Sequence, residues 1–139
     1  MNRAASKMQI PMSSMTGQTE WPAEWASFLD EHTGTRVMRL TNAACINHPL
    51  YYLTNSFSSD NRALIFTSDR AGKMDLYQVT LADGMIRRLT DLHGLQPFSG
   101  NVVDDEVFFS TERQIHRLSL AAGRDQIIAN QPGADFGEV

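Results

Sequence analysis

Cysteine is scarce in this sequence: Cys45 is the only one among 139 residues. A lone cysteine excludes an internal disulfide framework and is compatible with a reducing compartment. Long apolar runs are also absent, and the N-terminal stretch MNRAASKMQIPMSSMTGQ lacks the apolar core of a secretory signal. We therefore expect a cytoplasmic protein without a membrane partner, in which residues 1–20 form a flexible leader.

Charge of one sign is limited as well, with 12 Lys and Arg against 16 Asp and Glu and a formal net charge of -4. This balance argues against a general polyanion binder. The sequence also lacks the interleaved basic and aromatic residues of a nucleic-acid surface, so we expect no nucleic-acid partner. The sequence has no Gly-x-Ser-x-Gly motif, no Walker loop, no His-Glu-x-x-His and no cysteine pair with zinc spacing. We therefore assign no catalytic residue and no metal ligand in this chain.

The sequence does contain a repeat. Residues 56–91, SFSSDNRALIFTSDRAGKMDLYQVTLADGMIRRLTD, predict four short strands separated by polar turns. The pattern returns downstream, where VFFST (107–111) matches LIFTS (64–68) and IHRLSLAAG (115–123) matches LYQVTLADG (76–84). A period of about 40 residues is typical of the four-stranded blades of a β-propeller.

The N-terminal side of the repeat holds only the last strand of a unit, because TGTRVMRLTN (33–42) matches DGMIRRLTD (83–91). In many propellers the first strand of the chain completes the last blade and leaves no open edge. A ring needs roughly four to eight blades, and a repeat array needs about three units to bury a continuous core. We therefore expect an all-β partial β-propeller that is the front part of a longer protein. A small self-contained β domain, or subunits that assemble a ring between them, is the competing interpretation.

The expected division of the chain follows from these matches. After the leader come a short helix or rim segment (21–34), a closing outer strand (35–42), the first blade (52–91), the second blade (97–130) and a tail (131–139). Pro22 is expected to begin the helix, and Trp21, Trp25 and Phe28 to supply its apolar face, which packs against the rim or stacks on a ligand. The open sheet edges of such a fold favour self-association.

One end of the blades is expected to hold the ligand. The loop that enters the innermost strand and the hairpin between the second and third strands share this end, so the pattern gathers polar side chains there: His48, Tyr51, Tyr52, Arg70, Lys73, His93, Gln96 and Arg113. Cationic and imidazole groups suit an anionic ligand. We take His48, Tyr51, Arg70 and His93 as the substrate-binding candidates.

Simpler interpretations of the same residues remain open. An Asn-His-Pro turn often holds a histidine that only makes loop hydrogen bonds, and Arg70 and Lys73 are common residues of solvated hairpins. Asp69 is interpreted as a turn residue whose carboxylate accepts nearby N–H groups. His116 falls at the strand position that matches Tyr77, which indicates a residue of the sheet face and not a site.

The unit 56–91 resembles the TolB-type propeller repeat. More narrowly, TGTRVMRLTN followed by NHPLYYLTNSFSSDNRALIFTSDR is similar to the beginning of oligogalacturonate lyases, which are seven-bladed propellers. The resemblance covers about residues 21–130, the front third of such an enzyme. The second blade departs from the repeat, since GNVVDDE replaces the usual Ser-Pro-Asp-Gly turn.

This resemblance implies β-elimination on short pectin fragments, a step of carbohydrate catabolism, with an anionic uronate oligosaccharide as ligand and manganese as the divalent ion. A metal on the uronate carboxylate and a positioned base both lower the barrier to removing the neighbouring proton. The family's metal ligands and base lie in later blades, so the resemblance leaves His48 as a pocket-lining residue and this chain alone inactive. A noncatalytic TolB-type binding module and the N-terminal propeller of a peptidase are the alternatives.

Overall fold

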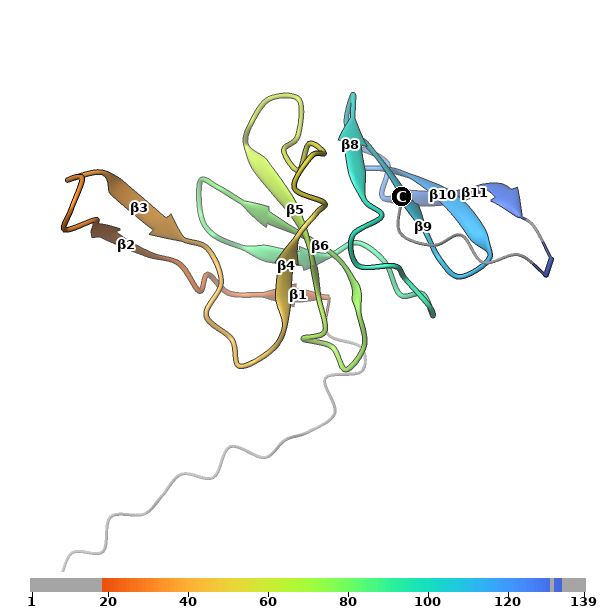
Figure 1. The fold of residues 1–139 in the computed structure, drawn as a ribbon, viewed down its shortest axis with the longest axis horizontal. Coiled ribbons are helices and arrows are strands. Elements are labelled where there is room, and N and C mark those ends of the chain that lie inside the picture. Colours follow the sequence, from red (N-terminus) through yellow and green to blue (C-terminus); the bar gives the residue numbers. More distant parts are fainter. Residues whose placement is uncertain (1–18, 131, 134–139) are drawn as a thin grey trace, which may run out of the picture.

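The computed structural model describes residues 19–130, 132 and 133, so nearly all of the expected leader and most of the tail lie outside the described residues. The regular elements of the described part of the chain are all β-strands. Among these residues there is no helix long and apolar enough to cross a membrane. The strands form a five-stranded sheet (β1-β7-β6-β5-β4), a four-stranded sheet (β11-β10-β9-β8) and a two-stranded sheet (β2-β3). Figure 1 shows the three sheets side by side in one row. The prediction of an all-β partial propeller is confirmed.

The first blade consists of β4 (Asn47–Pro49), β5 (Ala63–Ser68), β6 (Asp75–Thr80) and β7 (Ile86–Arg88), all antiparallel. It begins earlier than the expected residue 52, because β4 pairs with the end of β5. The chain then leaves the sheet and returns at Phe57, which bridges to Leu64. The innermost strand is therefore interrupted, and the sequence pattern revealed only its second part.

The second blade consists of β8 (Asn101–Val103), β9 (Glu106–Ser110), β10 (Gln114–Ser119) and β11 (Arg124–Asn130). Asp104 and Asp105 join β8 to β9 with φ values of 50° and 61°. Two successive positive φ angles are the requirement of a two-residue type I′ hairpin, and Asp tolerates them better than most residues. The GNVVDDE segment, which departs from the repeat, thus forms a two-residue hairpin turn at Asp104 and Asp105.

A separate hairpin precedes the first blade, with β2 (Ala26–Leu29) paired to β3 (Arg36–Arg39). The predicted helix over 21–34 is wrong. The strand expected over 35–42 is present as β3 but is not alone, because it pairs with β2, and its role in closing a ring stays a prediction. The Asp30 carboxylate accepts hydrogen bonds from the N–H of His32, the N–H of Thr33 and the Thr33 hydroxyl, at 2.8–3.1 Å, which closes a turn in the last part of the expected helix. Gly34, at φ 68°, completes that turn.

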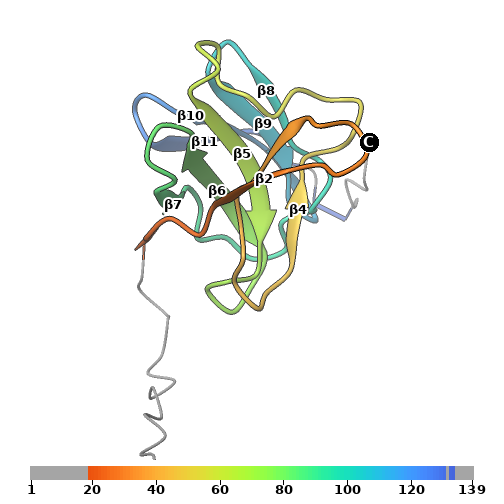
Figure 2. The ribbon, with the colours of Figure 1, turned by 90° about the vertical axis from the view of Figure 1, so that its left-hand side faces the viewer.

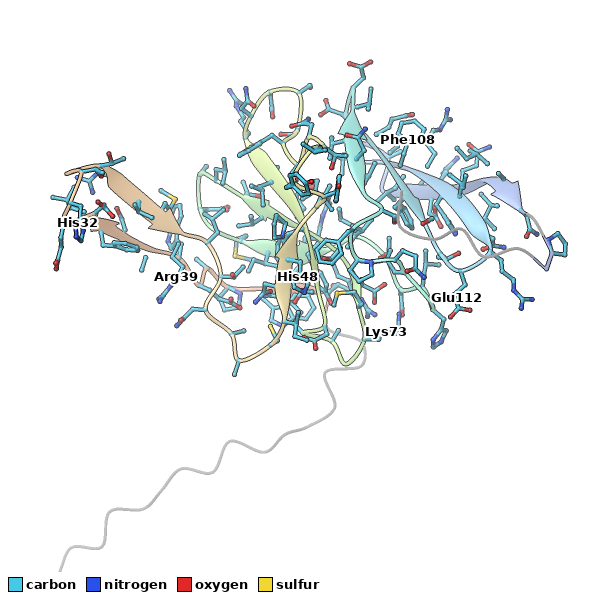
Figure 3. The ribbon with its side chains drawn as sticks, viewed as in Figure 1. His32, Arg39, His48, Lys73, Phe108 and Glu112 are labelled. Carbon is cyan, nitrogen blue, oxygen red and sulfur yellow. The ribbon has the colours of Figure 1, made fainter. Side chains whose placement is uncertain are left out.

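The hairpin lies beside the face of the first blade that is turned away from the second blade (Figures 1 and 2). His32 and Arg39 mark its two ends in Figure 3. Every residue of β2 and β3 is exposed, including Phe28 and Leu29, whose exposed fractions are 51% and 60%. By the sequence match of β3 with β7, the hairpin corresponds to the outer half of a blade.

The strand β1 (Glu20–Trp21) adds a fifth strand to the first blade, at the outer edge of β7. Glu20 pairs with Arg87 and Trp21 with Ile86. Trp21 is buried, and its ring meets that of Tyr77 edge-on, with centroids 5.5 Å apart. Along the sequence, the chain thus pairs with the first blade at β1 and then continues into the hairpin.

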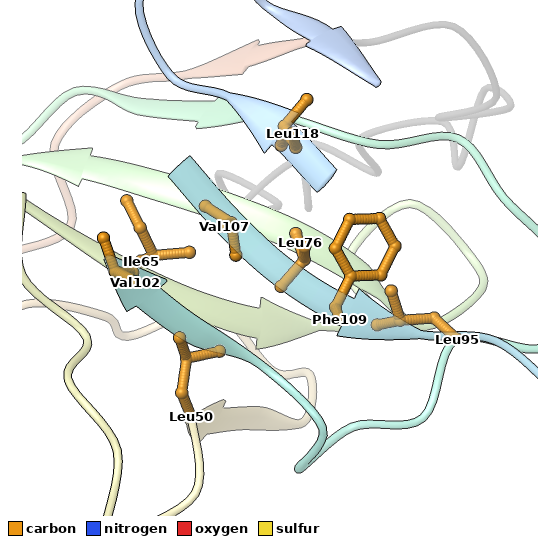
Figure 4. Close-up of a cluster of buried hydrophobic side chains, with 8 residues drawn as sticks. All are labelled: Leu50, Ile65, Leu76, Leu95, Val102, Val107, Phe109 and Leu118. Carbon is orange, nitrogen blue, oxygen red and sulfur yellow. The ribbon is translucent and has the colours of Figure 1, made fainter. Parts of the chain in front are cut away.

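The main core lies between the two blades (Figure 4). Its members come from both sheets, from the chain that leaves β4 and from the link between β7 and β8: Leu50, Ile65, Leu76, Leu95, Val102, Val107, Phe109 and Leu118. A second cluster fills the opposite face of the first blade: Trp21, Phe66, Ala71, Tyr77, Val79 and Ile86. Fully burying one such aliphatic or aromatic side chain contributes about 1.5–3 kcal/mol, so the two blades form a single packed unit.

Candidate functional site

The loop surface, as we call residues 42–46, 69–74, 91–94 and 111–113, brings together the four segments that the sequence places at the ligand end. The Asp69 carboxylate accepts a backbone N–H, as expected, but the donor at 2.8 Å is Ile46 of the neighbouring loop and not a residue of its own turn. The Lys73 ammonium donates to the Leu92 carbonyl at 2.8 Å and so ties the β5–β6 hairpin to the link that leads to the second blade. Gly94 lies against the Glu112 side chain, and Figure 3 shows Lys73 and Glu112 along the same edge.

His48 lies on β4, opposite Thr67, and not in a free loop. Its half-buried ring contacts Phe98 of the second blade, with centroids 5.0 Å apart and planes tilted by 57°. It also lines a cavity of about 160 Å³ together with Thr41, Asn47, Pro49, Leu64, Phe66 and Val79. The ring is thus held against the second blade, and the predicted contact of His48 with a ligand stays a prediction.

Arg70 is buried, with 2% of its side chain exposed, so its interpretation as a solvated hairpin residue is wrong. Its guanidinium donates to the carboxylate of Glu24 at 2.9 Å, to the side-chain oxygen of Asn47 at 2.9 Å and to the Ser68 hydroxyl at 3.2 Å. The structure gives Arg70 a structural role, and its predicted contact with a ligand stays a prediction.

Glu24 is the residue of this network that sequence reasoning missed. Burial alone would raise the pKa of its carboxyl, but hydrogen bonds from the N–H groups of Asn42 and Ala43, together with the Arg70 guanidinium, hold the pKa below its usual 4.5. No repeat pattern marks Glu24, because its partners lie in other segments of the chain. The carboxylate stays ionised in the folded protein at neutral pH.

Lys73 is held by carboxylates of its own chain, as Arg70 is. Its ammonium lies 2.9 Å from the fully buried Asp75 and 2.7 Å from the exposed Asp91. The hydrogen bond from Lys73 and then the charge of Arg88 lower the pKa of Asp91 below its usual 3.8. The charge of Lys73 is thus largely balanced inside the protein.

The other candidates are dispersed. Tyr51 is half-buried beyond the end of β4, where its ring lies 4.5 Å from that of Tyr52, and a hydrogen bond with Tyr52 raises the pKa of the Tyr51 phenol. His93 and Arg113 are exposed on the loop surface, and the backbone N–H of Gln96 donates to Ser110. Among the described residues, Arg70 reaches the strand of His48 through Asn47, but no recorded contact joins His48, Tyr51, Arg70 and His93 directly.

His116 lies between the blades, on a sheet face as expected. It is 1% exposed, stacks on Phe109 with planes at 11°, and lies 3.0 Å from the Asp125 carboxylate through its Nδ1. Its Nε2 lies 3.5 Å from the Thr111 hydroxyl. Although these three side chains follow the order of a catalytic triad, the buried imidazole is closed to a substrate and serves packing.

A larger cavity, with a volume of about 270 Å³, lies beside the second blade. It is lined by Thr54, Phe98, Ser99, Asn101, Phe108, Phe109, Ser110 and Ile115. The buried Ser110 hydroxyl has no hydrogen-bond partner within the described part of the chain. Phe98, which lines this cavity, also contacts the His48 ring.

Metal-ligating side chains do not cluster in the described residues. Nowhere in residues 19–130, 132 and 133 do three or more His, Cys, Asp or Glu side chains form a group that could hold a metal ion. Manganese in proteins favours several such donors around one ion. The residues described here therefore do not fit a manganese site.

Comparisons with known proteins agree on one family. The family model for oligogalacturonate lyase matches residues 15–137. The oligogalacturonide lyase of Pectobacterium atrosepticum is 27% identical over 114 residues, which cover 80% of this chain and 29% of that protein.

Solved structures give the same result. An oligogalacturonate lyase in complex with manganese superposes with a TM-score of 0.74 at 26% identity, over 82% of this chain and 31% of that one. An oligogalacturonate lyase from Vibrio parahaemolyticus shares the fold, with a TM-score of 0.75 at 24% identity over the same shares. The chain thus spans less than a third of the length of these relatives.

Proposed function

Since the chain belongs to the oligogalacturonate lyase family, we propose that it forms part of a catalyst that cleaves short oligogalacturonates by β-elimination. The observation that carries this proposal is the family match over residues 15–137, combined with a loop surface built from the two blades. A role in pectin breakdown and a cytoplasmic location belong to the same proposal.

The chemistry defines what such a site must do. A base removes the proton next to the uronate carboxylate, and the electron pair forms a double bond as the glycosidic oxygen leaves. Negative charge that develops on the carboxylate side must be stabilised by nearby cationic groups or hydrogen-bond donors. One solved relative is in complex with manganese, but the described residues of this chain do not fit such an ion.

The part of this chain in the reaction is to bind and orient the substrate. The His48 imidazole, held against Phe98, can donate or accept a hydrogen bond with a sugar hydroxyl or carboxylate. The exposed His93 and Arg113 add donors for carboxylates on the loop surface. Arg70 and Lys73 contribute little to this attraction, since their charges are already paired.

Binding of digalacturonate to the 139-residue chain tests the proposal. We expect the His48 ring signals in nuclear magnetic resonance spectra to shift on titration with digalacturonate and to stay unchanged with a neutral disaccharide. His48→Ala should weaken binding about tenfold, as expected for the loss of one hydrogen bond to a charged group. His32→Ala, on the distant hairpin turn, is the matched control.

An absorbance assay for unsaturated uronates separates binding from catalysis. We expect no turnover by these 139 residues with or without added manganese. Robust turnover would refute the view that the catalytic groups lie outside this chain. Absence of any binding at millimolar digalacturonate would refute the proposal that His48 and the loop surface bind the substrate.

A further inference from the structure

One buried ion pair connects three segments that are far apart in the sequence. Glu24 comes from the link between β1 and β2, Arg70 from the β5–β6 hairpin and Asn47 from the first strand of the blade. Arg70 contacts both partners, each at 2.9 Å. We call these three residues the latch.

The surroundings of Arg70 make the latch rigid. Its guanidinium carbon lies 5.4–5.6 Å from the ring centroids of Trp21, Phe66 and Tyr77, which cover it from the side of the second cluster. The side chains of Arg70 and Glu24 are 2% and 16% exposed. Charge-assisted hydrogen bonds in such a sheltered place are stronger than those at the surface. The guanidinium is thus bound on all three of its nitrogens by groups of its own chain.

The latch also fixes the segment that leads to His48. The second carboxylate oxygen of Glu24 accepts the N–H groups of Asn42 and Ala43, at 2.8 and 3.0 Å. At the other end of this segment, Arg70 holds the side chain of Asn47. Both ends of residues 42–47 are therefore tied to the same ion pair, immediately before His48.

We propose that the Glu24–Arg70–Asn47 latch is a positioning device, which sets the segment before His48 and so governs ligand binding by His48 without touching the ligand. The inference rests on the proposed function only in assigning a uronate ligand to His48. It also gives Arg70 a different role from the direct contact that the sequence predicts.

Glu24→Gln is the variant that tests the latch. An amide has one acceptor oxygen, so it can serve either Arg70 or the N–H groups of Asn42 and Ala43, and its NH2 group then faces the other donors. Glu106→Gln is the matched control, because Glu106 forms an ion pair with Arg117 in which both side chains are about a third or more exposed.

Three measurements on the full 139-residue chain decide the outcome. Relative to wild type, we expect Glu24→Gln to speed hydrogen exchange at the Asn42 and Ala43 amides about tenfold or more, to shift the His48 ring signals, and to weaken digalacturonate binding about tenfold. Glu106→Gln should change none of these. Asn47→Ala keeps the Glu24–Arg70 ion pair but removes the contact between Arg70 and residue 47. It should therefore shift the His48 signals, and it serves as the test if Glu24→Gln fails to fold.

Unchanged exchange and unchanged His48 signals in Glu24→Gln would overturn the latch. The same holds if exchange at Asn42 rises only in step with that of the core amide of Ile65, since this indicates general destabilisation. If wild type does not bind digalacturonate but the exchange and ring signals respond as expected, the proposed function fails while the positioning role stands.

Discussion

The buried carboxylate of Asp75 offers the sharpest test of how this fold is held together. One of its oxygens accepts the Thr90 hydroxyl at 2.8 Å and the Leu92 N–H at 3.0 Å, and the other accepts Arg88 at 2.6 Å and Lys73 at 2.9 Å. Asp75→Asn keeps the shape and removes the charge. If the amide oxygen stays with Thr90 and Leu92, the NH2 group must face two cations.

The expected loss follows from these contacts. Two charge-assisted hydrogen bonds contribute about 1.5–3 kcal/mol each, and both cations keep their contact with the exposed Asp91. We therefore expect Asp75→Asn to lower the free energy of unfolding by about 2–4 kcal/mol, since Asp91 replaces only part of what is lost. For a chain of this length the Tm should fall by about 6–12 °C.

Thermal and urea unfolding, followed by tryptophan fluorescence, measure this loss. Asp60→Asn is the control, because Asp60 accepts hydrogen bonds from Ser58 and the Arg62 N–H at an exposed turn and should matter much less. If Asp75→Asn unfolds at the same temperature as Asp60→Asn, the reasoning from buried charge is refuted.

Three further outcomes are expected. Because the folded-state pKa of Glu24 lies below 4.5, its stabilisation is complete above that pH and disappears as the pH falls through the folded value; the Tm difference between wild type and Glu24→Gln should shrink accordingly, and a constant difference would contradict this. Burial raises the pKa of Tyr77 to about 12, so stability should fall as the pH rises from about 10 to 12, and a Tyr77→Phe variant should lose this dependence. Gly84→Ala places a Cβ 2.8 Å from Ala23 at a φ of 73° and should destabilise more than Gly72→Ala, which has a φ of 92° and open space; equal Tm losses would show that packing at Gly84 is unimportant.

Much of the fold was predictable because side chains alternate regularly between the two faces of each blade. In β5 and β6 every second side chain turns to the same cluster, as Ile65 and Leu76 do toward the second blade and Phe66 and Tyr77 away from it. This alternation and its return after about one blade length carry the prediction of an all-β repeat. The contacts between the loop segments then follow from the order of the strands.

The error at the N-terminal segment has a physical cause. The spacing of Trp21, Trp25 and Phe28 is that of one helix face, but the three side chains lie in three different environments. Trp21 enters the core of the first blade, Trp25 packs near Gly84, and Phe28 is exposed on β2. Tertiary contacts that no local pattern contains decide the conformation here.

The candidate site was only partly accessible from sequence for a related reason. The loop segments and His48 follow from the repeat, whereas the fate of Arg70 depends on Glu24, an acidic residue without any motif around it. A cation on a hairpin is as compatible with solvent as with a buried ion pair. Only the path of the N-terminal segment across the blade distinguishes the two.

That path has a consequence for the order of folding. The hairpin β2–β3 closes within a short stretch of chain, but Glu20 cannot pair until Arg87 is in place at the outer edge of β7. Closing so long a loop costs more conformational entropy and is slow compared with forming a hairpin. The first described strand of the chain is therefore expected to dock late, after synthesis has passed β7. Until then the Trp21 indole and the Arg70 guanidinium are not in contact with each other.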